Sequence, residues 1–219
     1  MFARWLAHID RVLLAKGRAD RDWLLATIWG GICYGAVKGT FGGLTGDRGL
    51  QIAYSAIKVP MLIGVTTILS LPTFFVMNTL AGLRNDFAQA LRAVIATQGA
   101  VSVILAAFAP LTAVWYLGSA GYSEAITFNG VMFASASLAG QWVLRRRYRE
   151  LIVGNSRHRA MLYLWVGIYS FVGIQMGWVL RPFVGEPGTA VTFFRESAWG
   201  NAYVVVFEMV WQVVKSFVS

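Results

Sequence analysis

The stretch "GGICYGAVKGTFGGLTG" (30–46) contains seven glycines in seventeen positions. Four of them follow one another at four-residue spacing: Gly31, Gly35, Gly39 and Gly43. Residues four apart lie on the same face of a helix, so this row predicts a smooth groove along one side. Helices in lipid associate through close backbone contact, which glycine permits. The stretch therefore predicts a membrane helix that packs closely against another helix through a glycine zipper.

The composition of the whole chain also indicates a membrane protein. Hydrophobic residues make up 57% of the 219 positions, and charged residues make up only 13%. Soluble domains carry about 25% charged residues. We therefore predict an all-α integral membrane protein with two parts: a cytoplasmic amphipathic helix within 1–22 and one transmembrane domain over 23–219.

Apolar segments long enough to cross a hydrocarbon core of about 30 Å follow one another along this domain. Pro60 and Pro72 fall in the second segment and Pro110 in the third, so bends are expected there. The first and the last segments are the least secure spans. The six predicted spans are 23–44, 53–82, 93–117, 125–144, 160–180 and 200–219.

The basic residues predict the orientation of the chain. The N-terminal tail and two predicted loops, 83–92 and 145–159, are rich in arginine, whereas the intervening loops are not. Basic loops remain in the cytoplasm, so both termini are expected on the cytoplasmic side of a bacterial inner membrane. Residues 2–16 place Phe2, Trp5 and Ile9 on one helix face, which favours either the bilayer interface or the protein's own surface.

The partner of the glycine row is open at this point. The row either packs against another helix of the same chain or forms an interface with a second protein or a second copy. Candidate internal partners are the small residues of later spans: Gly130 with Ala134, Ala136 with Gly140, and Gly173 with Gly177.

Intramembrane charges are candidate functional residues. Lys38 could reach the interface or pair with Glu208, and Lys58 is expected to extend to the interface from near the end of its span. Glu208, Gln212 and Lys215 form a polar stripe at helical spacing, which indicates interior packing, surface exposure or a conduction path.

Signals for catalysis, metals and cofactors are lacking. The single cysteine, Cys33, permits no disulfide within the chain, and the two histidines do not lie mid-membrane. No nucleophile elbow, phosphate-binding loop or zinc motif occurs, so we expect neither an enzyme nor a cofactor.

The run "RRRYRE" (145–150) has two interpretations. It fixes the topology, or Arg145, Arg146, Arg147 and Arg149 bind anionic lipid headgroups. We do not expect nucleic acid as a partner. The outer stretch 177–203 is rich in aromatic and turn-forming residues, and its arginines and glutamates can pair with one another. It is expected to be an ordered cap or a docking surface.

Two stretches carry a resemblance: "AIKVPMLIGVTTILSLPTFFVMNTLAGL" (56–83) and "GWVLRPFVGEP" (177–187). Together they resemble bacterial multi-span membrane proteins of uncharacterised function that are loosely similar to Yip-family domains. The resemblance extends over about residues 25–210. It implies a compact helical bundle, membrane organisation and partner binding, and no known catalytic residues.

The sequence is compatible with three candidate functions. The first is a non-catalytic membrane subunit or scaffold that assembles with other membrane proteins or with itself through glycine-rich packing. The second is a channel or transporter for a small or lipidic solute. The third, a lipid-modifying enzyme, would need a polar cluster near Arg84, Asn85 and Asp86.

Overall fold

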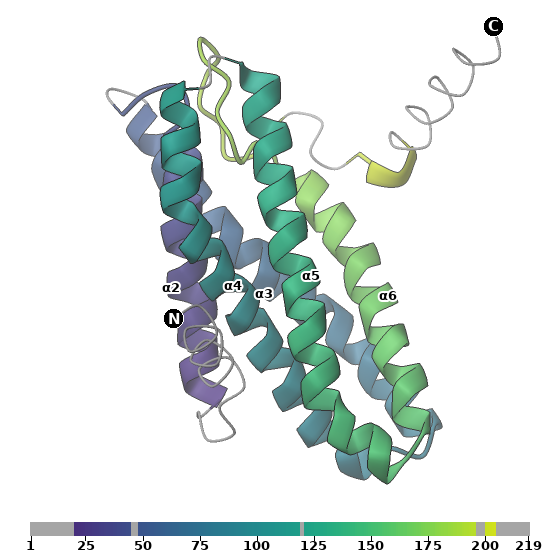
Figure 1. Ribbon diagram of the computed structural model, residues 1–219. Coiled ribbons are helices and arrows are strands. Elements are labelled where there is room, and N and C mark those ends of the chain that lie inside the picture. The colour runs from purple at the N-terminus through teal and green to yellow at the C-terminus, as the bar shows by residue number, and fades with distance from the viewer. Residues whose placement is uncertain (1–19, 45–47, 119–120, 196–199, 205–219) are drawn as a thin grey trace, which may run out of the picture.

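The fold is a bundle of long helices, as the computed structural model shows (Figure 1). The structure describes residues 20–44, 48–118, 121–195 and 200–204. All regular secondary structure in these ranges is helical, which confirms the all-α part of the predicted class. The elements are α2 (Asp20–Gly39), α3 (Arg48–Leu80), the short 3-10 helix η1 (Arg84–Asp86), α4 (Phe87–Gly118), α5 (Tyr122–Gly154) and α6 (Arg157–Val179).

Three stretches in the described ranges are long and apolar enough to cross a membrane. They are Arg48–Leu80, Arg84–Gly118 and Arg157–Val179. The predicted N-terminal helix over 2–16 and the stripe of Glu208, Gln212 and Lys215 lie outside the described residues.

The helices do not end where the apolar segments end. Residues 145–159 were predicted as a loop, and this is wrong because α5 continues to Gly154. Leu144, Tyr148 and Leu151 are buried at spacings of four and three, so one side of the arginine-rich run still packs on the core. At the other end of the bundle, α2 stops at Gly39, so Gly43 is not part of the helical row. Gly43 adopts a φ of +128°, which glycine tolerates.

Three of the predicted row glycines face α3 of the same chain. At Gly35 and Gly39 an added side chain would collide with α3, mostly with its backbone, and at Gly31 it would be tight against Pro60. An added Cβ would lie 3.0 Å from the nitrogen of Pro60 at Gly31, 2.3 Å from the carbonyl oxygen of Ser55 at Gly35, and 2.7 Å from the Cα of Ile52 at Gly39. The row is thus used within the chain, on a helix that was not among the candidate partners.

Glycine also sets the contact between α2 and α4. Gly30 of α2 lies against Ser102 of α4, and Gly99 of α4 lies against Trp23 of α2. The later small residues have other surroundings: Gly140 meets Val101 of α4, and Gly173 is in ordinary contact with Thr66 of α3. Nothing in the described residues lies within 4 Å of a Cβ added at Gly130 or Gly177.

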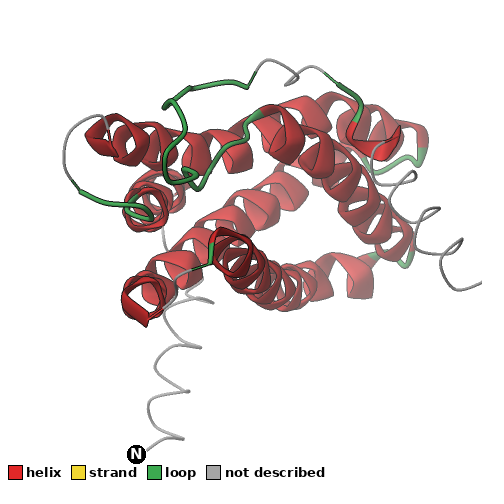
Figure 2. Cartoon of the chain, turned by 90° about the horizontal axis from the view of Figure 1, so that it is seen from above, coloured by secondary structure: helices red, strands yellow, loops and turns green. Residues whose placement is uncertain are grey.

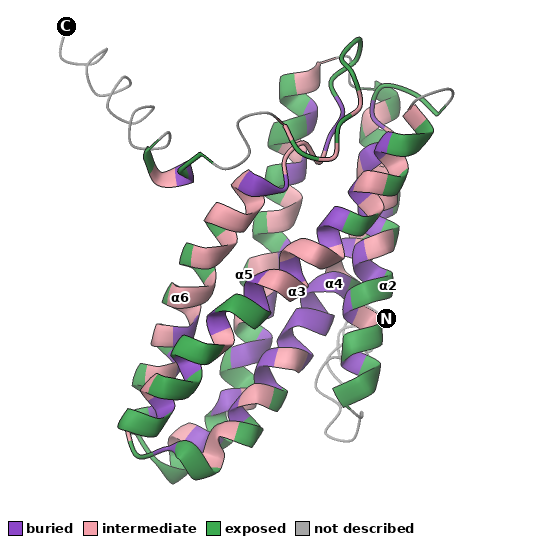
Figure 3. Cartoon of the chain, turned by 180° about the vertical axis from the view of Figure 1, so that it is seen from behind, coloured by how far each residue is buried: buried purple, intermediate pink, exposed green. Residues whose placement is uncertain are grey.

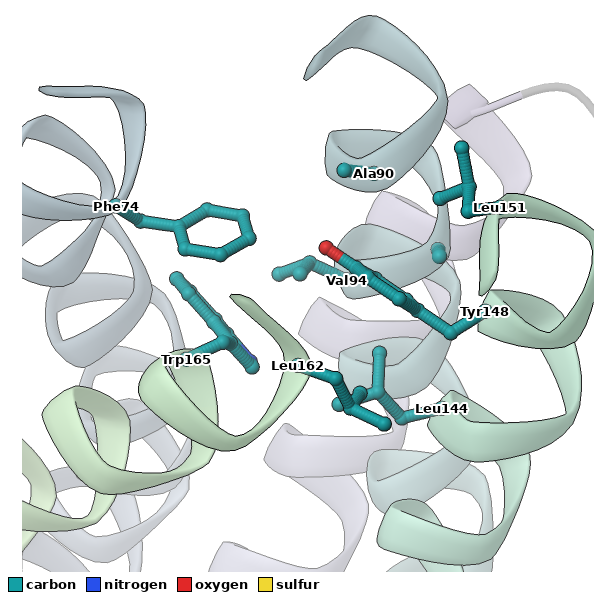
Figure 4. Close-up of a cluster of buried hydrophobic side chains, with 9 residues drawn as sticks. Phe74, Ala90, Val94, Leu144, Tyr148, Leu151, Leu162 and Trp165 are labelled. Atoms are coloured by element: carbon teal, nitrogen blue, oxygen red, sulfur yellow. The ribbon is translucent and has the colours of Figure 1, made fainter. Parts of the chain in front are cut away.

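The remaining helices complete the bundle around α3 and α4. Helix α5 packs on α4, and α6 packs on α3 and α5 (Figures 1 and 2). Buried residues line the inner faces, while the outer faces of α5 and α6 are largely exposed or half-buried (Figure 3). Figure 4 shows one core cluster, in which Phe74, Val94, Tyr148 and Trp165 meet from four helices.

The two ends of the bundle differ. We call the end with the loop Leu180–Arg195 the upper end, and the end with the α3–α4 and α5–α6 connections the lower end (Figure 1). At the lower end, Nε2 of the buried His158 lies 3.0 Å from a carboxylate oxygen of Asp86, which joins the start of α6 to η1.

Candidate anion-binding site

A pocket of about 410 Å³ lies at the upper end of the bundle. The loop Leu180–Arg195 lies at this end of the bundle (Figures 1 and 2), and most of its residues line the pocket. The end of α2, the start of α3 and the start of α5 form the walls, through Lys38, Arg48 and Gln51, and Tyr122 with Asn129.

The polar face of α3 holds this loop in place. The ammonium of Lys58 donates to the carbonyl of Pro182 at 2.7 Å, and the hydroxyl of Ser55 donates to the carbonyl of Phe183 at 2.6 Å. About two turns further out, Nη2 of Arg48 donates to the carbonyl of Glu186 at 2.8 Å. Lys58 is buried in the protein, with its ammonium directed to the loop at the upper end. Its charge serves to anchor the loop.

The charged side chains that line the pocket are mostly basic. Lys38, Arg48, Arg181 and Arg195 contribute cations, and Glu186 contributes the one carboxylate among the described lining residues. The ammonium of Lys38 lies 4.6 Å from the centre of the Phe183 ring, which stabilises a cation over an aromatic face. The predicted pairing of Lys38 with Glu208 lies outside the described residues.

Two arginines from opposite ends of the loop meet at one tryptophan. The guanidinium carbon of Arg181 lies 3.6 Å from the centre of the Trp178 ring, and that of Arg195 lies 4.0 Å from it. The indole therefore fixes both guanidinium groups beside the pocket. Burial, and then the adjacent charge of Arg195, lower the pKa of Arg181.

The two guanidinium groups have donors to spare. Nε and Nη2 of Arg181 and of Arg195 are buried, and none of these four atoms finds an acceptor in the described part of the chain. The predicted ion pairs of these arginines with Glu186 are not formed. All four atoms can only donate hydrogen bonds, because arginine has no acceptor. A ligand held beside these two positive charges would have to accept hydrogen bonds, so an anion fits best.

The floor of the pocket is held by a small hydrogen-bond network. Asn129 of α5 accepts from the hydroxyl of Tyr34 at 3.0 Å and donates to the hydroxyl of Tyr116 at 2.5 Å. Asn129 also donates to the carbonyl of Ala125 within its own helix. These bonds hold the amide of Asn129 from three helices, so its position at the pocket is fixed by the protein itself.

The sequence pointed to this region without defining a site. The stretch 177–203 was singled out as a cap or docking surface, and its residues 180–195 do form an ordered cap. The contributions of Gln51, Ser55 and Lys58 were missed. Their spacing of four and three in an apolar helix was the available signal, since it places all three on one inward face.

The other predicted site residues lie elsewhere. Arg145, Arg146 and Arg149 are exposed on the lower half of α5, whereas Arg147 turns towards α2, with its guanidinium 5.0 Å from the Trp23 ring. Comparison of the chain with protein-family models, with curated proteins and with solved structures found no match.

Proposed function

We propose that this protein is a multi-span membrane protein that recognises an anionic group in the upper pocket, as a channel or transporter for a small or lipidic anion. The observation that carries the proposal is the charge of the pocket lining, where Lys38, Arg48, Arg181 and Arg195 stand against one carboxylate, that of Glu186, among the described residues. The proposal includes no covalent chemistry.

The excess of positive charge at the pocket favours a bound anion. Four cationic side chains line it against one carboxylate among the described residues. A phosphate or carboxylate can accept from two guanidinium nitrogens at once, so one ligand would satisfy several donors. A pocket of 410 Å³ is also within the usual range for small-molecule sites, about 300–1,000 Å³.

The proposed topology extends the three apolar stretches to six spans. Helix α2 has 20 residues, enough to cover about 30 Å, and α5 has 33. With α2, α5 and a last span over 200–219, the arginine-rich lower end lies in the cytoplasm of a bacterial inner membrane and the upper pocket faces the outside. The helix over 2–16 is proposed to lie in the cytoplasmic interface.

A subunit or scaffold in a membrane complex is the second proposal. The glycine row no longer supports it, because Gly31, Gly35 and Gly39 already contact α3. What favours it is α6, where only 11% of the most apolar window is buried. Tyr163, Phe171 and Ile174 are exposed along this helix, so it has an apolar face for lipid or for another membrane protein.

The test is anion binding by the purified protein in nanodiscs of neutral lipid. Inorganic phosphate, sulfate and succinate are titrated by calorimetry, and short-chain phosphatidic acid is tested in parallel to separate a free anion from a lipid headgroup. We expect saturable binding that Arg195→Gln weakens at least tenfold. Arg84→Gln, an exposed arginine at the lower end, is the matched control and should bind as the wild type does.

The same preparations separate recognition from transport. Proteoliposomes loaded with the anion that binds report its flux, and Arg195→Gln should reduce this flux in step with binding. Absence of binding by all four ligands, or equal binding by Arg195→Gln and wild type, would refute the proposal. Binding without flux would retain the pocket and remove the transport function.

A further inference from the structure

The lower half of α5 presents a basic face with a tryptophan at its upper edge. Trp142, Arg145, Arg146, Arg149 and Val153 are all exposed and recur at spacings of three and four, so they share one side of the helix. The opposite side of these turns carries the buried core residues Val143, Leu144, Tyr148 and Leu151. We call the exposed set the α5 basic face.

This face continues into a groove at the corner between α5 and α6. An open groove of about 630 Å³ is lined by Trp142, Arg145, Arg146, Arg149, Ile152, Val153 and Arg159. Arg159 comes from the first turn of α6, so a fourth guanidinium reaches the groove from a second helix. Glu150 is the one carboxylate in the corresponding turns of α5, residues 142–154.

Aromatic contacts distinguish the groove arginines from their neighbour. The guanidinium of Arg146 lies 4.9 Å from the Trp142 ring, on the exposed face. Arg147 lies instead over Trp23 of α2 and does not line the groove. Of the four arginines in the run 145–149, three therefore point to the groove and one packs inside the bundle.

The surface above the groove indicates the depth of the membrane. Val131 and Leu138, 52% and 72% exposed, lie higher on α5. From Leu138 to Arg145 the helix rises about 10 Å at 1.5 Å per residue. Trp142 lies between them, and tryptophan prefers the level of the headgroups. Down α5 the surface is first apolar, then carries a tryptophan, and then carries a cluster of arginines. This order matches a phospholipid, whose acyl chains would contact the apolar part and whose phosphate would contact the arginines.

We infer that this groove binds the headgroup of an anionic glycerophospholipid. The phosphate would lie among Arg145, Arg149 and Arg159, and the acyl chains would run up α5 along Leu138. Four guanidinium groups and one carboxylate make the groove complementary to a negatively charged headgroup. The apolar surface above them favours a lipid over a free anion, because a free anion has no acyl chains to contact it. The groove lies at the end of the bundle opposite the upper pocket, so this inference does not depend on the proposed transport function.

The test compares two double variants that remove the same charge from the same end of the protein. Arg145→Gln with Arg149→Gln removes groove arginines, and Arg84→Gln with Arg92→Gln removes arginines outside it. Both pairs are exposed, so neither pair disturbs the core. Each protein is reconstituted in nanodiscs with equal phosphatidylglycerol and phosphatidylcholine, and native mass spectrometry measures the ratio of the two lipids that remain bound.

The wild type should retain phosphatidylglycerol in preference to phosphatidylcholine. At the typical contribution of one basic residue near an anionic surface, the loss of Arg145 and Arg149 should lower this preference about 30-fold. The control pair should keep it. Equal preference in the groove variant and the wild type would overturn the inference, and so would an equal loss in the control variant, because the effect would then come from net charge. Thermal unfolding of both variants is measured alongside, so that a folding defect is seen separately.

Discussion

Replacement of Gly35 by alanine tests the closest helix contact in the bundle. An added Cβ would lie 2.3 Å from the carbonyl oxygen of Ser55 and 2.9 Å from the Cα of Ala56. Ordinary contact at such atoms begins at 3.4 Å. Because both atoms belong to the backbone of α3, no side chain can rotate away, and the two helices must separate by about 1 Å.

The expected loss of stability in Gly35→Ala is the difference between two opposing effects on the free energy of unfolding. Overpacking a well-packed contact costs about 1–3 kcal/mol, and a rigid backbone partner favours the upper part of that range. In the opposite direction, alanine in place of glycine within a helix stabilises that helix by up to about 1 kcal/mol. We therefore expect Gly35→Ala to lower the free energy of unfolding by about 2 kcal/mol.

The assay is reversible unfolding in mixed micelles, with Gly64→Ala as the matched control. Gly64 lies within α3, where an added Cβ meets nothing within 4 Å in the described residues. This control should be unchanged or up to about 1 kcal/mol more stable. If Gly35→Ala were as stable as Gly64→Ala, the backbones of α2 and α3 would not be in contact at Gly35 and the packing described above would be wrong.

Three further predictions concern single hydrogen bonds. Lys58→Met should loosen the loop, because the carbonyl of Pro182 loses its donor while the bonds from Ser55 and Arg48 remain. Trypsin should then cleave after Arg195 faster than in wild type, and equal cleavage rates would count against the anchor. Asp86→Ala should lower the free energy of unfolding by about 1–3 kcal/mol, because Nε2 of His158, which is 1% exposed, loses its partner. Substitution of the exposed neighbour, Asn85→Ala, is the control, and an equal change in both variants would contradict the role of the contact. Tyr169→Phe removes the bond from its hydroxyl to Oε1 of Gln98 on α4 and should cost about 1 kcal/mol in the same unfolding assay, whereas unchanged stability would mean that this bond contributes nothing.

The sequence predicted a close-packed helix at the glycine row but not its neighbour. A bare groove accepts any helix that can bring backbone close to it, so the row by itself does not identify a partner. Helix α3 fits because Ser55 is small, so its backbone can lie against Gly35 while its Cβ lies near Gly39. The candidate partners on later spans were chosen for their own small residues, which is not what the contact requires.

The helix ends and the upper pocket were harder to predict, for different reasons. Charge in "RRRYRE" marks the end of an apolar segment, whereas the helix ends only where its buried side ends, after Leu151. Arg181 and Arg195 are separated by a stretch of turn-forming residues, and no periodicity relates them. Only the folded loop brings both guanidinium groups to Trp178.

The glycine contacts also constrain how this protein can move. Helices that touch backbone to backbone at Gly31, Gly35 and Gly39 cannot slide along one another without collision. Gly30 and Gly99 impose the same restriction between α2 and α4. These three helices are therefore expected to behave as one rigid body, and any opening of the bundle should occur by tilting of α5 and α6 against it.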